Sequence, residues 1–246
     1  MRKLLPFTLL FLAACSASSL FGGGDGAPHL SSKWVREKSG GVSIDVEYPW
    51  VDTGLTADIA SDVNHRLFLL ADATIAAFRR DVRSPEIAVH SSVSTLSMRI
   101  EPSLVTQDIL SLSMPVTSSL AGAAHENTYR LFFNYDVRGR IPFSLTDLLT
   151  DAPAGFKTLS ESVTREMADR ARAGGAPDNE WIQLLKEQTP LEPETPQTFT
   201  IEHGDLVLWF EPGRMAPIAQ GEQQVRISFA TLSPLLNERG KKLLAL

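Results

Sequence analysis

The sequence contains a single cysteine, Cys15, and this residue lies close to the N-terminus. No disulfide bond can therefore form within the chain, so packing and hydrogen bonds have to stabilise the fold. Blocks of positive charge are also missing, and the formal net charge is -6. A nucleic-acid partner is therefore not expected. The content of 43% hydrophobic and 21% charged residues is typical of a globular protein with one large or two small domains.

The long apolar run of the sequence lies at the N-terminus, where Leu4 to Ala14 follow Arg2 and Lys3. This run is too short for a membrane-spanning helix and suits the apolar region of a secretory signal. It ends in Leu12-Ala13-Ala14-Cys15, which resembles the lipobox of bacterial lipoproteins. The resemblance predicts a signal peptide at residues 1–14 and a membrane anchor through a lipid on Cys15. An ordinary signal peptide with an incidental cysteine is the alternative.

The residues around the expected cleavage point also indicate where in the cell the protein is located. Ser16, rather than an aspartate, follows the cysteine, which resembles the outer-membrane sorting pattern of Gram-negative bacteria. The expected location is therefore the cell envelope, on the outer membrane facing the periplasm if the source is Gram-negative. Residues 15–32 are rich in Gly and Ser and predict a flexible tether that holds the folded part off the bilayer.

Hydrophobic periodicity predicts the elements of the first half. Alternating residues predict a strand over 42–48, and apolar residues at helical spacing predict a long helix over about 56–80. Further alternation predicts strands over 96–100, 110–114 and 131–137. Since no helical pattern interrupts these three strands, we expect an antiparallel meander.

The second half repeats the mixture of helices and strands. A short helix capped by Ser144 is expected before 149, a longer one over about 154–172, and another after Asp178. A hairpin turning near His203-Gly204-Asp205, a strand over 223–229 and a helix from Ser233 follow. The prediction is an α+β fold, with an antiparallel sheet formed by a meander plus a C-terminal hairpin and with helices packed on one face. Residues 33–150 and 151–246 are expected to form two subdomains of one continuous unit.

Motifs in a fixed order connect these elements to a known family. They read Ile109-Leu110-Ser111, Gly122-Ala123-Ala124-His125, Asn134-Tyr135-Asp136, Gly139, Leu145 to Leu149, Ala216-Pro217 and Gly221. This order resembles the extracytoplasmic α+β domains of RsiV-like anti-sigma factors, whose outer domain senses lysozyme, and of PdaC-like peptidoglycan deacetylases, where the domain is non-catalytic. The resemblance covers about residues 42–236. Ala123 stands where the family has glycine, and Leu149 where it has an aromatic residue.

Motifs for catalysis and metal binding are lacking. The five histidines are far apart in the sequence, and no HExxH, CxxC, GxSxG, P-loop or GxGxxG pattern occurs. No cofactor and no metal are therefore expected. The chain also lacks a deacetylase domain beside the matching region and a cytoplasmic anti-sigma segment. The resemblance therefore implies an outer, ligand-facing module rather than an enzyme.

Three residues are the candidates for ligand contact: His125, Asn127 and Trp209. His125 admits three interpretations: a ligand contact, a structural residue that bonds to its small-residue turn, or a general base oriented by Glu126 or Asp136. Trp209 is expected to anchor a protein or sugar ligand if its sheet face is open. If a helix covers that face, Trp209 is expected to be a core residue.

The function expected from these observations is a lipid-anchored envelope binding module without catalysis, whose ligand is a muramidase-like protein or peptidoglycan. The acidic balance, -8 once Arg2 and Lys3 are removed, would steer a basic partner toward it. The alternative is a small cell-wall hydrolase that uses His125 with a nearby carboxylate. A structural lipoprotein without a ligand is the third hypothesis.

Overall fold

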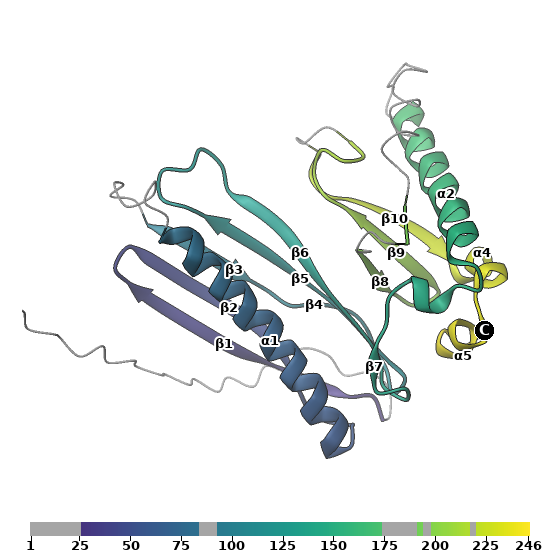
Figure 1. Cartoon of the computed structure of the whole chain (residues 1–246), viewed down its shortest axis with the longest axis horizontal. Helices are drawn as coiled ribbons and strands as arrows, with labels where there is room; N and C mark the ends of the chain where they lie inside the picture. Colours follow the sequence, from purple (N-terminus) through teal and green to yellow (C-terminus); the bar gives the residue numbers. More distant parts are fainter. Residues whose placement is uncertain (1–25, 84–92, 174–190, 194–197, 217–219) are drawn as a thin grey trace, which may run out of the picture.

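The structure, a computed structural model, describes residues 26–83, 93–173, 191–193, 198–216 and 220–246. In these residues, the strands form a seven-stranded sheet and a three-stranded sheet (Figure 1). The large sheet has the order β1-β2-β3-β5-β6-β7, with β4 paired to β5. Its strands are β1 (His29–Ser39), β2 (Val42–Thr53), β3 (Ser94–Met98), β4 (Glu101–Val105), β5 (Ile109–Ser119), β6 (Asn127–Asp136) and β7 (Ile141–Pro142).

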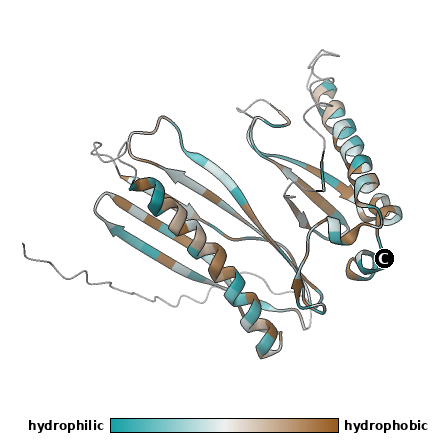
Figure 2. Cartoon of the chain, viewed as in Figure 1, coloured by the Kyte–Doolittle hydropathy of each residue, from teal (hydrophilic) through white to brown (hydrophobic). Residues whose placement is uncertain are grey.

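Helix α1 (Ala57–Val82) connects β2 to β3, which pair in parallel. Parallel neighbours need such a crossover, whereas the other pairs of the large sheet are antiparallel. The helix buries Val63, Leu67, Ala71, Ile75 and Phe78 against one face of the sheet. Figure 2 shows hydrophobic and hydrophilic residues alternating along the strands of this sheet, which places a core on its helix-covered face.

The smaller sheet has the order β10-β9-β8 and is entirely antiparallel. Its strands are β8 (Phe199–Ile201), β9 (Asp205–Phe210) and β10 (Gln223–Ser228). Helix α2 (Ala152–Ala173) packs against it through Phe156, Leu159, Val163 and Met167. The chain ends with α4 (Phe229–Leu232), the 3-10 helix η3 (Ser233–Leu235) and α5 (Glu238–Leu243).

The core beneath α2 contains residues from both sides of position 150. Leu104, Ile109 and Phe143 pack with Phe199 and Leu208 in one cluster. The 3-10 helix η1 (Thr146–Leu148) joins this cluster, and the amide of Asn237 donates to the carbonyl of Leu148 at 2.9 Å. The two expected subdomains therefore share a hydrophobic core.

A buried polar network joins the two sheets. The Ser111 hydroxyl donates to Asn134 Oδ1 at 2.7 Å and accepts from the amide of Ile201 at 2.7 Å, while Asn134 Nδ2 donates to the carbonyl of Phe199 at 3.0 Å. Ser111 is completely buried and Asn134 is 7% exposed. Because buried polar groups need partners, these bonds hold β8 in one position on β5 and β6.

The predicted α+β class is confirmed, with an antiparallel-dominated large sheet and a C-terminal antiparallel hairpin sheet. The long helix, the meander strands β3, β5 and β6, and the turn between β8 and β9 lie where the periodicity predicted them. The parallel pairing of β2 with β3 was not predicted, since alternation along a strand gives no information about the direction of its neighbour. The helix expected after Asp178 lies outside the described residues.

Two details of the sequence interpretation were wrong. The expected tether over residues 15–32 ends earlier, because β1 begins at His29 and pairs with β2 along its whole length. At the start of this strand, His29 has Nδ1 3.4 Å from Asp52 Oδ2. The helix expected after Ser144 is a single 3-10 turn, in which Ser144 donates its amide and its hydroxyl to Asp147, both at 2.7 Å.

No helix within the described residues is long and apolar enough to cross a membrane. Cys15 and the expected signal peptide lie before the first described residue, Gly26. Lipidation at Cys15 therefore stays a prediction.

The fold predicts a specific loss of stability at alkaline pH. Tyr135 is completely buried and donates its hydroxyl to Asp62 Oδ2 at 2.8 Å. Burial, together with this bond, raises the pKa of Tyr135 above its ordinary value of 10.0. The bound proton stabilises the folded state fully below pH 10, and this contribution is lost as the pH rises above 10 and the unfolded tyrosine ionises.

We therefore expect that, between pH 8 and 11, the wild-type protein loses about 1 kcal/mol more of its free energy of unfolding than the Tyr135→Phe variant. Urea unfolding followed by circular dichroism at both pH values measures the difference. Tyr48 and Tyr129 are present in both proteins, so their ionisation cancels in the comparison. Parallel pH profiles for the two proteins would contradict the prediction.

Candidate ligand-binding site between the two sheets

Strand β6 places Arg130 on the face of the large sheet that is opposite α1. Tyr129, Leu131, Phe133 and Tyr135 pack into the core beneath the helix. Because side chains alternate along a strand, Arg130, Phe132 and Asn134 point to the other face. That is the face on which the three-stranded sheet sits, as the bonds of Asn134 to β8 demonstrate.

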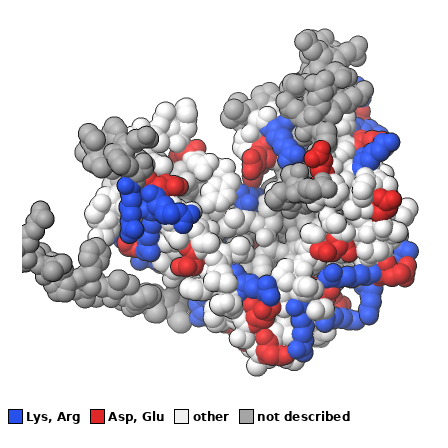
Figure 3. Space-filling model, viewed as in Figure 1, with Lys and Arg blue, Asp and Glu red and all other residues white. Residues whose placement is uncertain are grey.

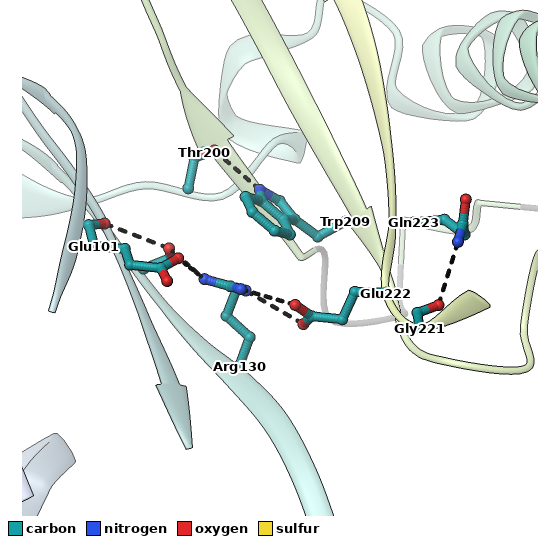
Figure 4. Close-up of polar contacts among 8 residues, drawn as sticks. Glu101, Arg130, Thr200, Trp209, Gly221, Glu222 and Gln223 are labelled. Carbon is teal, nitrogen blue, oxygen red and sulfur yellow. Dashed lines mark hydrogen bonds and ion pairs between the residues drawn. The ribbon is translucent and has the colours of Figure 1, made fainter. Parts of the chain in front are cut away.

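Arg130 pairs with two carboxylates, one from the large sheet and one from the part of the chain that carries the small sheet. Its Nε and Nη2 donate to Glu222 at 3.2 and 2.7 Å, which is a bidentate pair, and its Nη1 donates to Ser113 Oγ at 3.0 Å and to Glu101. Glu101 is on β4 and Ser113 on β5, whereas Glu222 lies just before β10. Figure 4 shows the guanidinium between Glu101 and Glu222, and only 8% of the arginine side chain is exposed.

Trp209, on β9, covers the flat side of this guanidinium. Arg130 Cζ lies 4.0 Å from the centroid of the tryptophan ring, a distance typical of a cation–π contact. The indole Nε1 donates to Thr200 Oγ1 at 3.0 Å, and the ring also packs against Phe132 with centroids 6.2 Å apart. The tryptophan is therefore fixed in position by an arginine, a hydroxyl and an aromatic ring (Figure 4).

The charges at this junction are one cation and two carboxylates. Burial acts to lower the pKa of Arg130, but the bonds with Glu222 and Glu101 outweigh burial and raise that pKa above its ordinary value. The arginine therefore stays charged at any physiological pH and cannot serve as a general acid or base. This arrangement is chemically suited to holding an anionic group rather than to transferring protons.

The surface next to the junction is recessed. Figure 3 shows acidic and basic side chains lying beside one another over much of the visible face. It also shows the surface hollowed between the part formed by β1 to β6 and the part formed by β8 to β10. These are the two parts that Arg130 and Glu222 connect. We define the junction site as Arg130, Trp209, Glu222, Glu101 and Ser113.

The structure does not bring the three predicted site residues together. His125 and Asn127 lie at the turn between β5 and β6, where Gly122 to Thr128 are all exposed. Trp209 lies beside Arg130, about 10 Å further along β6 from Asn127. Of the three candidates, only Trp209 belongs to the junction site.

The structure contradicts two of the contacts proposed for His125. Asp136, one of the two proposed orienting carboxylates, is at the opposite end of β6, about 30 Å from Asn127. It accepts from the amide of Gly139 at 2.7 Å and pairs with Arg239. Within the described residues, His125 makes no hydrogen bond to its own turn, which is closed instead by a bond from the amide of Ala123 to the carbonyl of Leu120.

Sequence reasoning missed Arg130, Glu101, Ser113 and Glu222. A signal for Arg130 was present, because it shares its parity with Phe132 and Asn134 on a strand whose other face is aromatic and aliphatic. A cation at an alternate position of a half-buried strand indicates a partner on that face. The two glutamates gave no signal, since they are 29 and 92 residues away from Arg130.

Metal-binding and nucleophile-activating groups of side chains are absent from the described part of the chain. No group of three or more His, Cys, Asp or Glu side chains there could hold a metal ion. Nor does any described histidine bond to a serine or threonine, the contact that activates a hydroxyl nucleophile. His29 Nδ1 lies 3.4 Å from Asp52 Oδ2, on the neighbouring strand.

The fold and the junction site define an α+β protein in which a helix-covered seven-stranded sheet is joined to a smaller sheet by a charged cluster. Residues 146–230 match the family model described as "Protein of unknown function (DUF3298)". The matched segment covers less than half of the chain. It contains Trp209 and Glu222, whereas Arg130, Glu101 and Ser113 precede it.

Two solved structures of DUF3298 family proteins have the same fold. A Bacteroides fragilis protein matches with a TM-score of 0.64 and 13% identity, covering 89% of this chain and 96% of its own. A Pseudomonas aeruginosa protein matches with a TM-score of 0.63 and 13% identity, covering 86% and 95%. At this identity the likeness establishes the architecture alone, over nearly the whole chain.

A curated relative is the protein named Esterase Rv3036c of Mycobacterium tuberculosis, which is 25% identical over 114 residues. The match covers 46% of this chain and 47% of that protein. The chain thus matches about half the length of this relative.

Proposed function

We propose that the protein is a lipid-anchored binding module of the cell envelope, which recognises peptidoglycan or a muramidase-like protein and performs no catalysis of its own. The junction site is the observation that carries this proposal. Its charged groups are paired with one another beside a surface hollow, and a tryptophan is presented on a rigid strand. Such a combination of an arginine, an aromatic ring and a recess is typical of recognition surfaces.

The anchor and the location follow from the N-terminal sequence. A lipid on Cys15 would hold the folded part at the membrane, and residues between Cys15 and β1 would separate the two. In a Gram-negative bacterium, Ser16 would direct the protein to the outer membrane, with its fold in the periplasm. Both peptidoglycan and lysozymes are reached from that compartment.

The test is direct binding of a chain that starts at Gly26. This start keeps all of β1 and the bond from Gln107 Nε2 to the carbonyl of Gly26 at 2.9 Å. We expect saturable binding to purified peptidoglycan or to a c-type lysozyme in biolayer interferometry, with a Kd in the micromolar range or below at physiological salt. Binding to neither ligand at low or physiological salt contradicts the proposal.

Variants locate the surface that binds. Trp209→Phe keeps an aromatic ring but loses the indole donor, and we expect it to weaken binding about tenfold. His125→Ala and Asn127→Ala change the exposed turn of the β5–β6 hairpin, about 10 Å from Arg130. Loss of binding in these two variants, with Trp209→Phe unaffected, would move the ligand surface to the hairpin turn.

A hydrolase is the second candidate, favoured by the name of the mycobacterial relative. Hydrolysis of 4-nitrophenyl acetate by the purified protein tests it. Turnover above the uncatalysed rate that is abolished by His125→Ala without a change in melting temperature would support the hydrolase. We expect no such turnover, because no described histidine contacts a nucleophile.

A further inference from the structure

We propose that Glu222 occupies a carboxylate-binding site of this protein as an internal substitute for the ligand, and that an external carboxylate displaces it from Arg130. The site consists of the Arg130 guanidinium, the Ser113 hydroxyl and the ring of Trp209. The inference deepens the proposed function, on which the choice of peptidoglycan fragments as ligands rests.

The first observation is the geometry of the ion pair. Arg130 presents Nε and Nη2 to the two oxygens of Glu222 at 3.2 and 2.7 Å. Two parallel bonds from one edge of a guanidinium are the arrangement by which arginine recognises a free carboxylate in a ligand. Nη1 donates to Glu101 and Ser113, so the edge formed by Nε and Nη2, which faces Glu222, is the one available for exchange.

The second observation is the position of Glu222 in the chain. It is not part of a strand, because β10 begins at Gln223, and it follows Gly221, whose φ is +70°. A Cβ at Gly221 would meet no atom within 4 Å, so the segment is not packed tightly at this point. Within the described residues, the Glu222 carboxylate has no bonding partner besides Arg130. Glu222 can therefore leave by a local movement of a connecting segment.

The third observation is the charge that remains when Glu222 leaves. Arg130 keeps its pair with Glu101 and its bond to Ser113 Oγ, so the buried cation is not left uncompensated. A ligand carboxylate would restore the bidentate pair and the original net charge of the junction. The exchange replaces one carboxylate with another. The free-energy cost of displacing Glu222 is therefore small enough for a ligand carboxylate to compete for Arg130.

The ring of Trp209 determines which chemical group can be attached to the ligand carboxylate. Its ring lies 4.0 Å from Arg130 Cζ and is only partly buried. An apolar or sugar group attached to the carboxylate would therefore lie against an aromatic surface. In peptidoglycan such a carboxylate stands at the C-terminus of the stem peptide, and also on the lactyl group of the muramic acid sugar once the stem peptide has been removed.

The experiment measures binding of small carboxylates to the full chain, purified in detergent micelles, by isothermal titration calorimetry. The probes are N-acetylmuramic acid and N-acetyl-D-alanyl-D-alanine, which distinguish the two sources, and N-acetylglucosamine, which lacks the carboxylate. Glu222→Gln and Glu222→Ala remove the internal competitor. We expect both variants to bind at least one of the carboxylates at least tenfold more tightly than the wild type, and not to bind N-acetylglucosamine.

Glu202 provides the matched control. It pairs with Arg226 on the same small sheet, and 27% of its side chain is exposed, compared with 26% for Glu222. Glu202→Gln therefore removes an equally exposed carboxylate without changing the junction site. Its affinities for all three probes should equal those of the wild type. Equal tightening in Glu202→Gln and Glu222→Gln overturns the inference, since any lost negative charge would then suffice.

A second measurement uses the unaltered protein, in case the Glu222 variants do not fold. The indole N–H resonance of Trp209, assigned by its loss in Trp209→Phe, should shift on addition of millimolar N-acetylmuramic acid or N-acetyl-D-alanyl-D-alanine and not of N-acetylglucosamine. No shift with either carboxylate, or no tightening in folded Glu222 variants, overturns the inference. If small carboxylates bind while peptidoglycan and lysozyme do not, the proposed function fails and the carboxylate site stands.

Discussion

Replacing Arg130 with methionine is expected to lower the free energy of unfolding by about 2–3 kcal/mol. The substitution leaves the carboxylates of Glu101 and Glu222 facing each other without their shared cation, and it removes the contact with the Trp209 ring. Breaking a fully buried ion pair costs more, about 3–5 kcal/mol. Here water reaches Glu101, which is 52% exposed, and relieves part of the repulsion.

Urea unfolding followed by tryptophan fluorescence and circular dichroism measures this loss. The double variant Arg130→Met/Glu222→Gln should recover more than 1 kcal/mol, because only one carboxylate then remains at the junction. Arg226→Met is the control, since Arg226 is 50% exposed and its pairs with Glu202 and Asp205 are expected to contribute less than about 1 kcal/mol. Equal losses in Arg130→Met and Arg226→Met would show that the junction pair has no special stabilising role.

Replacing Asn134 with alanine is expected to destabilise the protein by about 3 kcal/mol. The change removes the acceptor of Ser111 Oγ–H and the donor to the carbonyl of Phe199, both of which lie at the buried contact between the sheets. Each buried polar group left without a partner costs about 1–3 kcal/mol. Because these bonds attach β8 to the large sheet, we also expect the loss to appear as faster amide exchange in β8 and β9.

Asn127→Ala is the matched control for this prediction. It is the same substitution on the same strand, but Asn127 is exposed at the hairpin turn. Its effect on the free energy of unfolding should be within about 0.5 kcal/mol of zero. Hydrogen exchange followed by mass spectrometry separates the two sheets. Uniformly faster exchange throughout Asn134→Ala would mean that the network supports global stability without a particular role at the junction.

The predictions for Arg130 and Asn134 both concern the contact between the two sheets. Asn134 and Ser111 join the sheets in the buried layer, and Arg130 joins them four residues earlier along β6, beside the surface hollow. A rigid inner contact would hold the outer arginine and tryptophan in place. That arrangement is what a preorganised binding site requires.

The α+β class, the long helix α1, the strands β5 and β6 and the hairpin of β8 and β9 are all predictable from the sequence alone. The reason is that side-chain periodicity records which face of an element is buried, and this information is local. Alternation along β9 puts Trp209 on the face opposite Leu208 and Phe210, and those two residues lie in the core beneath α2.

The position of the small sheet, and the charges that it brings to the large sheet, depend on tertiary packing. Arg130 pairs with Glu222, which is 92 residues away in the sequence. Strand β2 pairs with β3, although a helix separates them in the sequence. Sequence periodicity does not show which residue a charged side chain pairs with. Alternation along a strand does not specify the direction of the neighbouring strand. The junction site therefore depends on long-range packing, whereas the elements that carry its residues follow from local patterns of hydrophobicity.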